Sequence, residues 1–448
     1  MNDKKDKLNS QSLLVIFAYA PTGFGHLRVS DALFRGLPDN ISPLLVGAHD
    51  KTLSYLYRIV SVNPLTRMIF EWFEHGALER MTTPIYRWYL RSHTQILYEQ
   101  LTTILDQRLT SPQTVLIIAT HFGLAHQIAA LKERLMSEKK IKILLAVQIT
   151  DDIPHRIWYV PGADIIFVPS DRTRKKLEQY GRRANLQVVK FETNPYPTNP
   201  LLNADLTVDE IENRLSQVNI EKKSQIHMMI PISGAAVGTA PLTKLIDELY
   251  TISHRFIFHV ITKNVSYTKT FVSEMLNRPY VKLEVSAIDK EVITKYINIY
   301  LKEVVSLEVT KPSEQAFKAL VNTNKRGGVI LLFTTPIGKQ EDDNLNFMAR
   351  HELIPSKSDQ QKLEKMAKNN VLILDDDKKI LNDAKKWRGI SLPKDSHEAA
   401  RFIWWCLNER LFLTMIAKKD YPSINDPHGN ELAENGVEKF WQKIAAII

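Results

Sequence analysis

Two short loops in this sequence combine glycine with residues that could bind or activate a substrate. The first, Gly23-Phe24-Gly25-His26, follows the apolar run 13–20, and the second, Ser233 to Gly238, follows the apolar run 226–232. A strand that opens into a glycine loop and then a helix offers bare N–H groups and the positive end of the helix dipole, which favour an anion such as a phosphate. The first loop lacks the third glycine of the dinucleotide fingerprint and the Lys-Ser/Thr of a P-loop. Either loop alone is equally compatible with a tight structural turn.

His26 is the candidate base of the first loop. Ligands of α/β sheets bind at the carboxyl ends of the strands, and the ordinary pKa of histidine suits proton abstraction near neutrality. A histidine that only caps the following helix is the alternative. Asp151 follows the apolar run 141–150 and is the second candidate, as a base or as the partner that orients His26. A helix cap or turn residue is the competing interpretation of Asp151.

The elements that must position these residues alternate between strand and helix. Apolar runs without polar alternation are typical of a parallel sheet with helices on both faces. Such runs occur at 13–20, 115–120, 141–150, 164–169, 226–232, 256–262, 281–285, 304–309, 329–334 and 371–374. Three prolines within 193–200 predict a connection, and a helix within 205–223 should begin at a capping box of Thr207 and Glu210. The pattern predicts an α/β fold with Rossmann-like domains at 13–200 and 223–396, followed by helices over 397–448.

Composition narrows the classes of protein. A chain of 448 residues is longer than a single hydrophobic core normally supports. Its 59 Lys+Arg against 50 Asp+Glu give a net charge of +9, which suits an anionic partner. A single cysteine, Cys406, excludes an intrachain disulfide framework and fits a cytoplasmic protein. No stretch has the composition of a transmembrane helix, and no nucleic-acid-binding module is recognisable. Lysines before the run 13–18 allow a signal peptide as an alternative, but a first buried strand fits better.

The order of motifs resembles that of the family 28 glycosyltransferases, which include monogalactosyldiacylglycerol synthases, processive diacylglycerol glucosyltransferases and lipid II N-acetylglucosaminyltransferases. The glycine–histidine loop with Ser30 matches their opening motif, and the match extends over about residues 13–355. Further matching residues are Thr120-His121, Thr150-Asp151, His155, Trp158, Asp164, Ser170, Gly234–Pro241, Lys311-Pro312 and 336–344.

The resemblance implies a GT-B fold, two facing Rossmann-like domains whose last helix returns to the first domain. It implies an inverting transfer of a sugar from a nucleotide donor, a UDP-sugar, to a lipid or other hydrophobic acceptor, with neither cofactor nor metal. His26 would be the base, with Asp151 in reserve. The donor-binding residues would be Gly234, Ala235, Gly238, Lys311, Glu314, Gln340, Glu341 and Asn344, and the acceptor-side residues would be Gly23, Gly25, His121, His155 and Trp158.

One departure from the family pattern keeps two alternatives open. Ser313 replaces the glycine of the Lys-Pro-Gly motif, and Lys318 or Ala319 stands where a ribose-binding glutamate is expected, with Glu314 the nearby carboxylate. A GT-B protein without transferase activity is therefore one alternative. A UDP-sugar 2-epimerase-like enzyme of the same fold is the other.

The segment 53–98 interleaves nine aromatic residues with five arginines, which suits contact with an anionic membrane surface. In the resembled enzymes the corresponding region meets the bilayer, which would make the protein a peripheral one on the inner face of the membrane. Ordinary helices packing aromatic faces on the core are the alternative. Two acidic clusters, Asp151-Asp152 and residues 375–377, fit turns and helix caps better than metal ligands.

Overall fold

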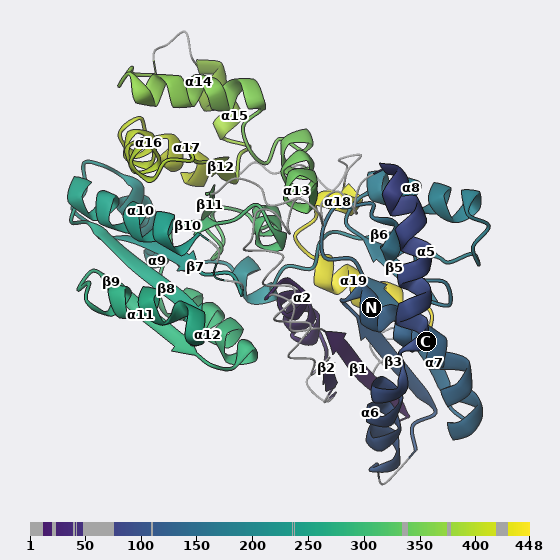
Figure 1. Ribbon diagram of the computed structural model, residues 1–448. Helices are drawn as coiled ribbons and strands as arrows, with labels where there is room; N and C mark the ends of the chain where they lie inside the picture. Colours follow the sequence, from purple (N-terminus) through teal and green to yellow (C-terminus); the bar gives the residue numbers. More distant parts are fainter. Residues whose placement is uncertain are drawn as a thin grey trace. The chain divides into compact units, whose positions relative to one another are not determined.

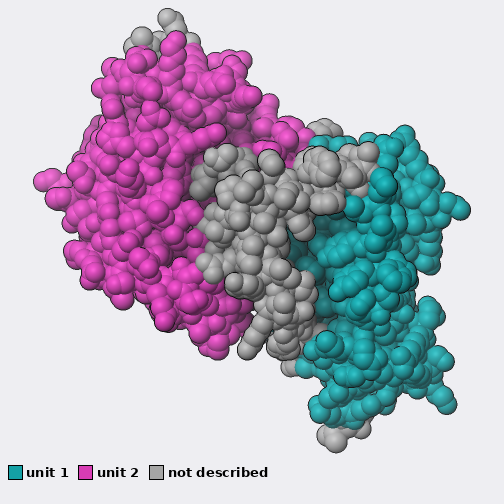
Figure 2. All heavy atoms as spheres, viewed as in Figure 1, with its two compact units in different colours: residues 1–199, 435–448 teal, residues 200–434 magenta. Residues whose placement is uncertain are grey.

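The computed structural model describes residues 12–19, 24–38, 41, 43–47, 76–108, 111–234, 236, 238–333, 339–373, 378–417 and 429–448. The chain divides into two compact units (Figure 2). Unit 1 comprises residues 1–199 and 435–448, and unit 2 comprises residues 200–434. Of the tail expected from residue 397 onward, residues 397–434 therefore cluster with unit 2, and residues 435–448 with unit 1.

Unit 1 is built on a parallel six-stranded sheet with the order β2-β1-β3-β4-β5-β6. Its strands are β1 (Leu13–Tyr19), β2 (Leu44–Gly47), β3 (Thr114–Ala119), β4 (Lys142–Gln148), β5 (Ile165–Val168) and β6 (Phe191–Thr193). Its helices are α2 (Phe24–Phe34), α5 (Gly76–Ser92), α6 (Gln95–Asp106), α7 (Phe122–Lys139), η1 (Arg156–Trp158), α8 (Asp171–Arg183) and α19 (Gly436–Ile444). The four strands predicted here are confirmed, whereas β2 and β6 were not predicted.

The strand β1 is an interior strand of this sheet. It pairs with β2 on one side and β3 on the other, and residues 14–18 are buried. Because both faces are covered, the strand is apolar at every position rather than at alternate positions. The carboxyl ends of β1, β3, β4 and β5 lie at one edge of the sheet, since all the strands run parallel, and the predicted acceptor-side residues follow these ends.

The C-terminal helix α19 packs onto unit 1, as predicted (Figure 1). The Trp441 indole N–H donates to the carbonyl of Leu33 at 2.9 Å, and the ring of Phe440 lies 4.4 Å from that of Phe167. Gly436 lets the helix begin in close contact with the backbone of Pro195, because a Cβ at position 436 would lie 2.4 Å from the Pro195 carbonyl oxygen. The last residues of the chain thus complete the core of unit 1.

Unit 2 contains a second parallel six-stranded sheet, with the order β12-β11-β10-β7-β8-β9. Its strands are β7 (Ile226–Pro231), β8 (Phe256–Lys263), β9 (Val281–Ser286), β10 (Leu307–Thr310), β11 (Val329–Leu332) and β12 (Gly389–Ser391). Its helices are η2 (Pro200–Asn203), α9 (Val208–Val218), α10 (Thr239–Ile252), η3 (Ser266–Thr268), α11 (Lys269–Leu276), α12 (Asp289–Lys302), η4 (Glu314–Leu320), α13 (Lys339–Arg350), α14 (Lys357–Lys368), α15 (Lys378–Ala384), α16 (Ser396–Asn408), α17 (Leu411–Ala417) and α18 (Gly429–Leu432). Two Rossmann-like sheets and a returning helix confirm the predicted fold class.

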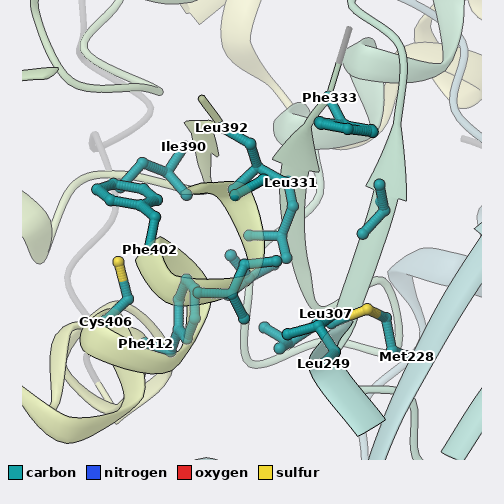
Figure 3. Close-up of a cluster of buried hydrophobic side chains, with 14 of the residues drawn as sticks. Met228, Leu249, Leu307, Leu331, Phe333, Ile390, Leu392, Phe402, Cys406 and Phe412 are labelled. Carbon is teal, nitrogen blue, oxygen red and sulfur yellow. The ribbon is translucent and has the colours of Figure 1, made fainter. Parts of the chain in front are cut away.

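The core of unit 2 lies between the sheet and the helices α10, α16 and α17. Figure 3 shows Met228, Leu307 and Leu331 of the strands beside Phe402 and Phe412 of the helices, all buried. The capping box of Thr207 and Glu210 begins α9, as predicted.

The strand predicted at 371–374 is wrong. Residues 371–373 form no strand, and Val371 and Leu372 are 44% and 62% exposed. The carbonyl of Val371 accepts a hydrogen bond from the Trp405 indole at 3.0 Å instead. The sheet is closed by β12, a short segment that is less apolar in sequence; residue 374 lies outside the described residues.

Within the described ranges, no helix has the length and apolar character needed to cross a bilayer.

Candidate functional site

His26 lies in the first turn of α2 and is tied to the end of β3. Its Nδ1 lies 2.6 Å from the carbonyl oxygen of Thr120. In return, the hydroxyls of Ser30 and Thr120 donate to the carbonyl oxygen of His26 at 2.9 Å and 3.1 Å. The two bonds between His26 and Thr120 hold the helix start against the neighbouring strand end, and the Ser30 and Thr120 hydroxyls lie 3.1 Å apart across the same junction.

The contact with Thr120 defines the tautomer of His26. A carbonyl oxygen only accepts hydrogen bonds, so Nδ1 must carry the proton. In the neutral ring, Nε2 then holds the lone pair and can accept a proton. A ring whose Nδ1–H is held by a fixed acceptor is the arrangement that orients a histidine for general-base chemistry.

A row of aromatic rings extends from His26 across unit 1. The ring of His121 lies 5.0 Å from that of His26, and Phe122 stacks on His121 at 4.7 Å. Trp158 and Tyr86 pack edgewise on Phe122 at 5.6 Å and 6.1 Å. The structure thus brings together His26, His121 and Trp158 of the predicted residues, and adds Phe122 and Tyr86.

His121 is held neutral beside His26. Burial, together with the charge that His26 would carry, lowers the pKa of His121 well below its ordinary 6.5. Within the described part of the chain, no group forms a hydrogen bond with its buried Nδ1, an arrangement that is costly.

The other predicted acceptor-side residues lie elsewhere on the edge. His155 is the N-cap of η1, where its Nδ1 accepts from the backbone N–H of Ile157 at 3.4 Å, and it lies 3.9 Å from Glu79. Asp151 follows β4 and accepts from the Thr150 hydroxyl at 3.3 Å. Gly25 lies in α2 beside His26, and Gly23 lies outside the described residues.

Asp152 has a structural role. It is fully buried and accepts hydrogen bonds from the hydroxyls of Ser170 and Thr173, the latter at 2.7 Å, at the start of α8. The predicted helix cap is not observed for Asp152, because Ser170 is the N-cap of α8 and Asp152 instead holds the Ser170 and Thr173 hydroxyls. The second acidic cluster, residues 375–377, lies outside the described residues.

The helix α5 exposes a stripe of apolar side chains to solvent. Met81, Ile85 and Trp88 are 67–69% exposed, and Tyr86 and Tyr89 are 43% and 49% exposed. The opposite face is anchored, since Arg87 donates to the Tyr180 hydroxyl at 3.1 Å and Arg91 to the carbonyl of Pro161 at 3.0 Å. The aromatic segment 53–98 therefore does not pack all its rings on the core; its part before residue 76 lies outside the described residues.

The second glycine loop joins β7 to α10 in unit 2. Gly238 is the N-cap of α10 with φ of 84°, a left-handed conformation that favours glycine, and Ala236 also has a positive φ of 52°. Among the described residues, no group forms a hydrogen bond with the buried Ser233 hydroxyl, and Tyr267 donates to the carbonyl of Gly234 at 2.7 Å. A helix start with a glycine cap is an arrangement that favours an anion. Ala235 lies outside the described residues.

Further predicted donor residues gather after β10. Lys311 Nζ lies 3.9 Å from a carboxylate oxygen of Glu341, and the Asn344 amide donates to the carbonyl of Pro312 at 3.5 Å. Glu341 and Asn344 are buried on α13, whereas Gln340 on the same helix is exposed. Glu314 begins η4 and is half-buried.

Lys318 has no access to a nucleotide ribose. Its ammonium is buried, pairs with the buried carboxylate of Glu308 and donates to the Tyr300 hydroxyl at 2.6 Å. Ala319 is buried as well. The position at which the resembled family has its ribose-binding glutamate is thus part of a buried internal network.

Sequence reasoning placed Ser233 in the second glycine loop but gave it no role, and it missed Phe122 and Tyr267. Phe122 directly follows the Thr120-His121 motif, and Ser233 directly precedes Gly234, so proximity to a motif was a usable signal for both. Tyr267 lies more than thirty residues after the loop that it contacts, and the sequence carries no sign of that contact.

Neither a protein-family model nor a curated protein sequence matches the chain. Solved structures of similar outline include MnaA from S. aureus with UDP, MurG from Acinetobacter baumannii, and UDP-GlcNAc 2-epimerase from Neisseria meningitidis with UDP-GlcNAc. Their identities to this chain are 10%, 8% and 10%, with TM-scores of 0.44, 0.44 and 0.45. Each match covers 97% of this chain, and 96%, 100% and 100% of the respective structures. Because the identities are low and the TM-scores lie below 0.5, these structures do not establish the reaction of this chain.

Proposed function

We propose that the protein is a glycosyltransferase that moves a sugar from a UDP-sugar to a hydroxyl of a lipid or other hydrophobic acceptor. One observation carries the proposal: the Thr120 carbonyl holds His26 Nδ1–H at 2.6 Å, which leaves Nε2 as the basic atom. The row of rings from His26 to Tyr86 leads to the exposed apolar stripe of α5. A base beside an apolar surface suits an acceptor hydroxyl carried on a lipid.

The proposed reaction is a single displacement with inversion. His26 Nε2 takes the proton of the acceptor hydroxyl as its oxygen bonds to the anomeric carbon of the sugar. The bond from that carbon to the diphosphate oxygen breaks, and UDP leaves with the electron pair. Asp151, at the end of β4, is the reserve base, and the buried, neutral His121 offers a polar edge for the acceptor.

Donor binding is proposed for unit 2. The N–H groups of the loop from Gly234 to Gly238, the Ser233 hydroxyl and the start of α10 favour the diphosphate and stabilise its growing charge. Lys311 adds a positive charge. Gln340, Glu341 and Asn344 are proposed to bind sugar hydroxyls, and Glu314 to take the place of the missing ribose-binding carboxylate.

Contact with an anionic membrane is the proposed means of reaching a lipid acceptor. Met81, Ile85 and Trp88 stand one helical turn apart on the exposed face of α5. Arg80, on the same helix, is exposed too and suits anionic headgroups.

The test measures UDP release from a panel of UDP-sugars, with and without vesicles that contain a diacylglycerol or another lipid alcohol. Release that depends on the acceptor, with a glycosylated lipid as the second product, is the expected result. Nucleotide binding without turnover would favour the inactive binding protein. Exchange of the proton at the sugar C2 without an acceptor would favour the epimerase, and absence of both binding and turnover would refute nucleotide-sugar chemistry altogether.

A further inference from the structure

Three side chains with metal-binding atoms converge in unit 2, away from the donor loop. His227 comes from β7, His259 from β8, and Glu303 directly follows α12 (Figure 1). His227 Nδ1 lies 2.9 Å from His259 Nε2 and 3.5 Å from Glu303 Oε2, and all three ligand atoms lie within 4.8 Å of one another. Among the described residues, no other group of three histidine, cysteine or acidic side chains converges in this way.

The strands place both histidines on one face of the sheet. Met228, Phe258 and Val260 belong to the core on the α10 side. Because side chains alternate along a strand, His227 and His259 point to the opposite face, where α12 packs on β8 and β9. Apolar residues would fill this layer equally well, so two imidazoles and a carboxylate here call for a chemical explanation.

The protonation state suits metal binding. Burial is the main cause that lowers the pKa of both rings, that of His259 to about 4. Neutral imidazole is the form that ligates metals. Two neutral rings can form one N–H···N hydrogen bond, in which one of the facing nitrogens carries the proton and only the other offers a lone pair. A metal ion would be bound by a lone pair on each of the two nitrogens.

We propose that His227 Nδ1, His259 Nε2 and Glu303 Oε2 form a site for a divalent transition-metal ion of the Zn²⁺ type. Two imidazoles and one carboxylate are a ligand set that zinc accepts, with a water in the fourth position. Tetrahedral zinc would hold its nitrogen ligands about 3.3 Å apart. The rings need to separate by only a few tenths of an ångström to reach that spacing.

The surroundings support a site that is open on one side. The side chains of Glu303 and His227 are 31% and 14% exposed, which gives an ion a path, whereas His259 is buried. Lys282 Nζ pairs with the other oxygen, Glu303 Oε1, at 2.7 Å, so Oε2 stays available. The backbone N–H of His227 donates to Gln217 at 3.0 Å, which fixes the strand carrying the first ligand.

The site is structural rather than catalytic in this proposal. His227 lies seven residues before Gly234, a separation on the order of 20 Å along an extended chain. Zn²⁺ would link the end of α12 to two strands of the sheet. We therefore expect it to raise the stability of unit 2 and to leave UDP binding unchanged.

The experiment titrates the full, untagged chain with Zn²⁺ by calorimetry and with Co²⁺ by visible absorption. One ion per chain, a tetrahedral Co²⁺ band and a rise in Tm of about 5 °C in excess Zn²⁺ are expected. Glu303→Gln, at a half-exposed position, and His227→Asn each remove a proposed ligand. Each should weaken Zn²⁺ binding by more than the roughly 10–100-fold lost when a residue that hydrogen-bonds to a metal ligand is replaced.

His397→Gln is the matched control, since His397 is an exposed histidine of unit 2 that pairs with Glu248 at 2.9 Å. It should bind Zn²⁺ as the unmodified chain does. Absence of Zn²⁺ and Co²⁺ binding at micromolar concentrations, or binding that Glu303→Gln and His227→Asn leave intact, would overturn the proposal. UDP affinity measured on the same samples keeps this result separate from the proposed transferase activity.

Discussion

At the scale of single residues, the proposed chemistry depends on which nitrogen of His26 carries its proton. The Thr120 carbonyl fixes the tautomer of His26, and burial keeps His121 neutral beside it. The sequence predicted His26 from its place after the first strand, and the family resemblance added the Thr120-His121 motif, with His121 as an acceptor-side residue. It could not predict the tautomer, which depends on one backbone carbonyl ninety-four residues away.

A buried histidine outside the site should make the stability pH-dependent. His126 is buried, its Nε2–H donates to the carbonyl of Ile157 at 2.8 Å, and burial lowers its pKa to about 3. The unfolded chain binds a proton at this residue below about pH 6.5, whereas the folded chain does not until about pH 3. The contribution is therefore complete above pH 6.5 and is lost as the pH falls, by about 2 kcal/mol at pH 5.

Urea unfolding at pH 7.5 and pH 5.0 measures this loss. His126→Gln keeps a donor for Ile157 but cannot titrate, so its free energy of unfolding should fall less between the two pH values. His254→Gln, at an exposed position, should behave as the unmodified chain does. Equal losses in the unmodified chain and in His126→Gln would show that His126 is not the group responsible.

At the scale of elements, the loop between β7 and α10 depends on glycine at its last position. Gly238→Ala should weaken UDP binding about tenfold, because a left-handed alanine costs roughly 1–2 kcal/mol and shifts the N–H groups that would hold the diphosphate. Gly162→Ala is the control, since Gly162 has a similar φ of 93° but lies in unit 1. Calorimetry with UDP should separate the two variants; equal affinities would argue against this loop as the diphosphate site.

The outward stripe of α5 gives a second prediction at this scale. Replacing Ile85 and Trp88 by serine should reduce binding to anionic phospholipid vesicles by tenfold or more, since burial of each side chain contributes about 1.5–3 kcal/mol. The fold should be unaffected, because both side chains are about two-thirds exposed. Val188→Ser, at a 90% exposed apolar residue of unit 1, is the control. Vesicle sedimentation measures the binding. Unchanged binding of the double variant would mean that α5 does not contact the membrane.

Most strands could be predicted from apolar runs, and the exceptions have physical causes. The strands β6 and β12 have three residues each, and β6 includes the polar residues Glu192 and Thr193. The strand β2 has four residues, as do β5, β10 and β11, but only the last three overlap the longer runs 164–169, 304–309 and 329–334. The run 371–374 has the composition of a strand, but two of its apolar residues are exposed. Whether such a run forms a strand depends on its pairing with a neighbouring strand. The sequence does not show which segment occupies the edge of a sheet.

At the scale of the whole molecule, the chain crosses between its units twice, and α19 completes unit 1 from the far end of the sequence. Trp441 is 4% exposed and bonds to Leu33. Trp441→Ala should therefore lower the free energy of unfolding of unit 1 by about 3–5 kcal/mol. Trp88→Ala, at a 69% exposed tryptophan of the same unit, should change it by about 0.5 kcal/mol or less. Urea denaturation measures both, and similar values for the two variants would mean that α19 does not support the core.

The most direct test of the proposed function is the turnover of His26→Asn. The asparagine amide can replace Nδ1–H as the donor to Thr120, so the local fold should persist while the base is lost. We expect kcat for acceptor-dependent UDP release to fall by roughly 10²–10⁴-fold, with UDP affinity unchanged because the proposed donor-binding residues lie in unit 2. A folded His26→Asn protein that keeps more than about a tenth of the activity would contradict the assignment of His26 as the base.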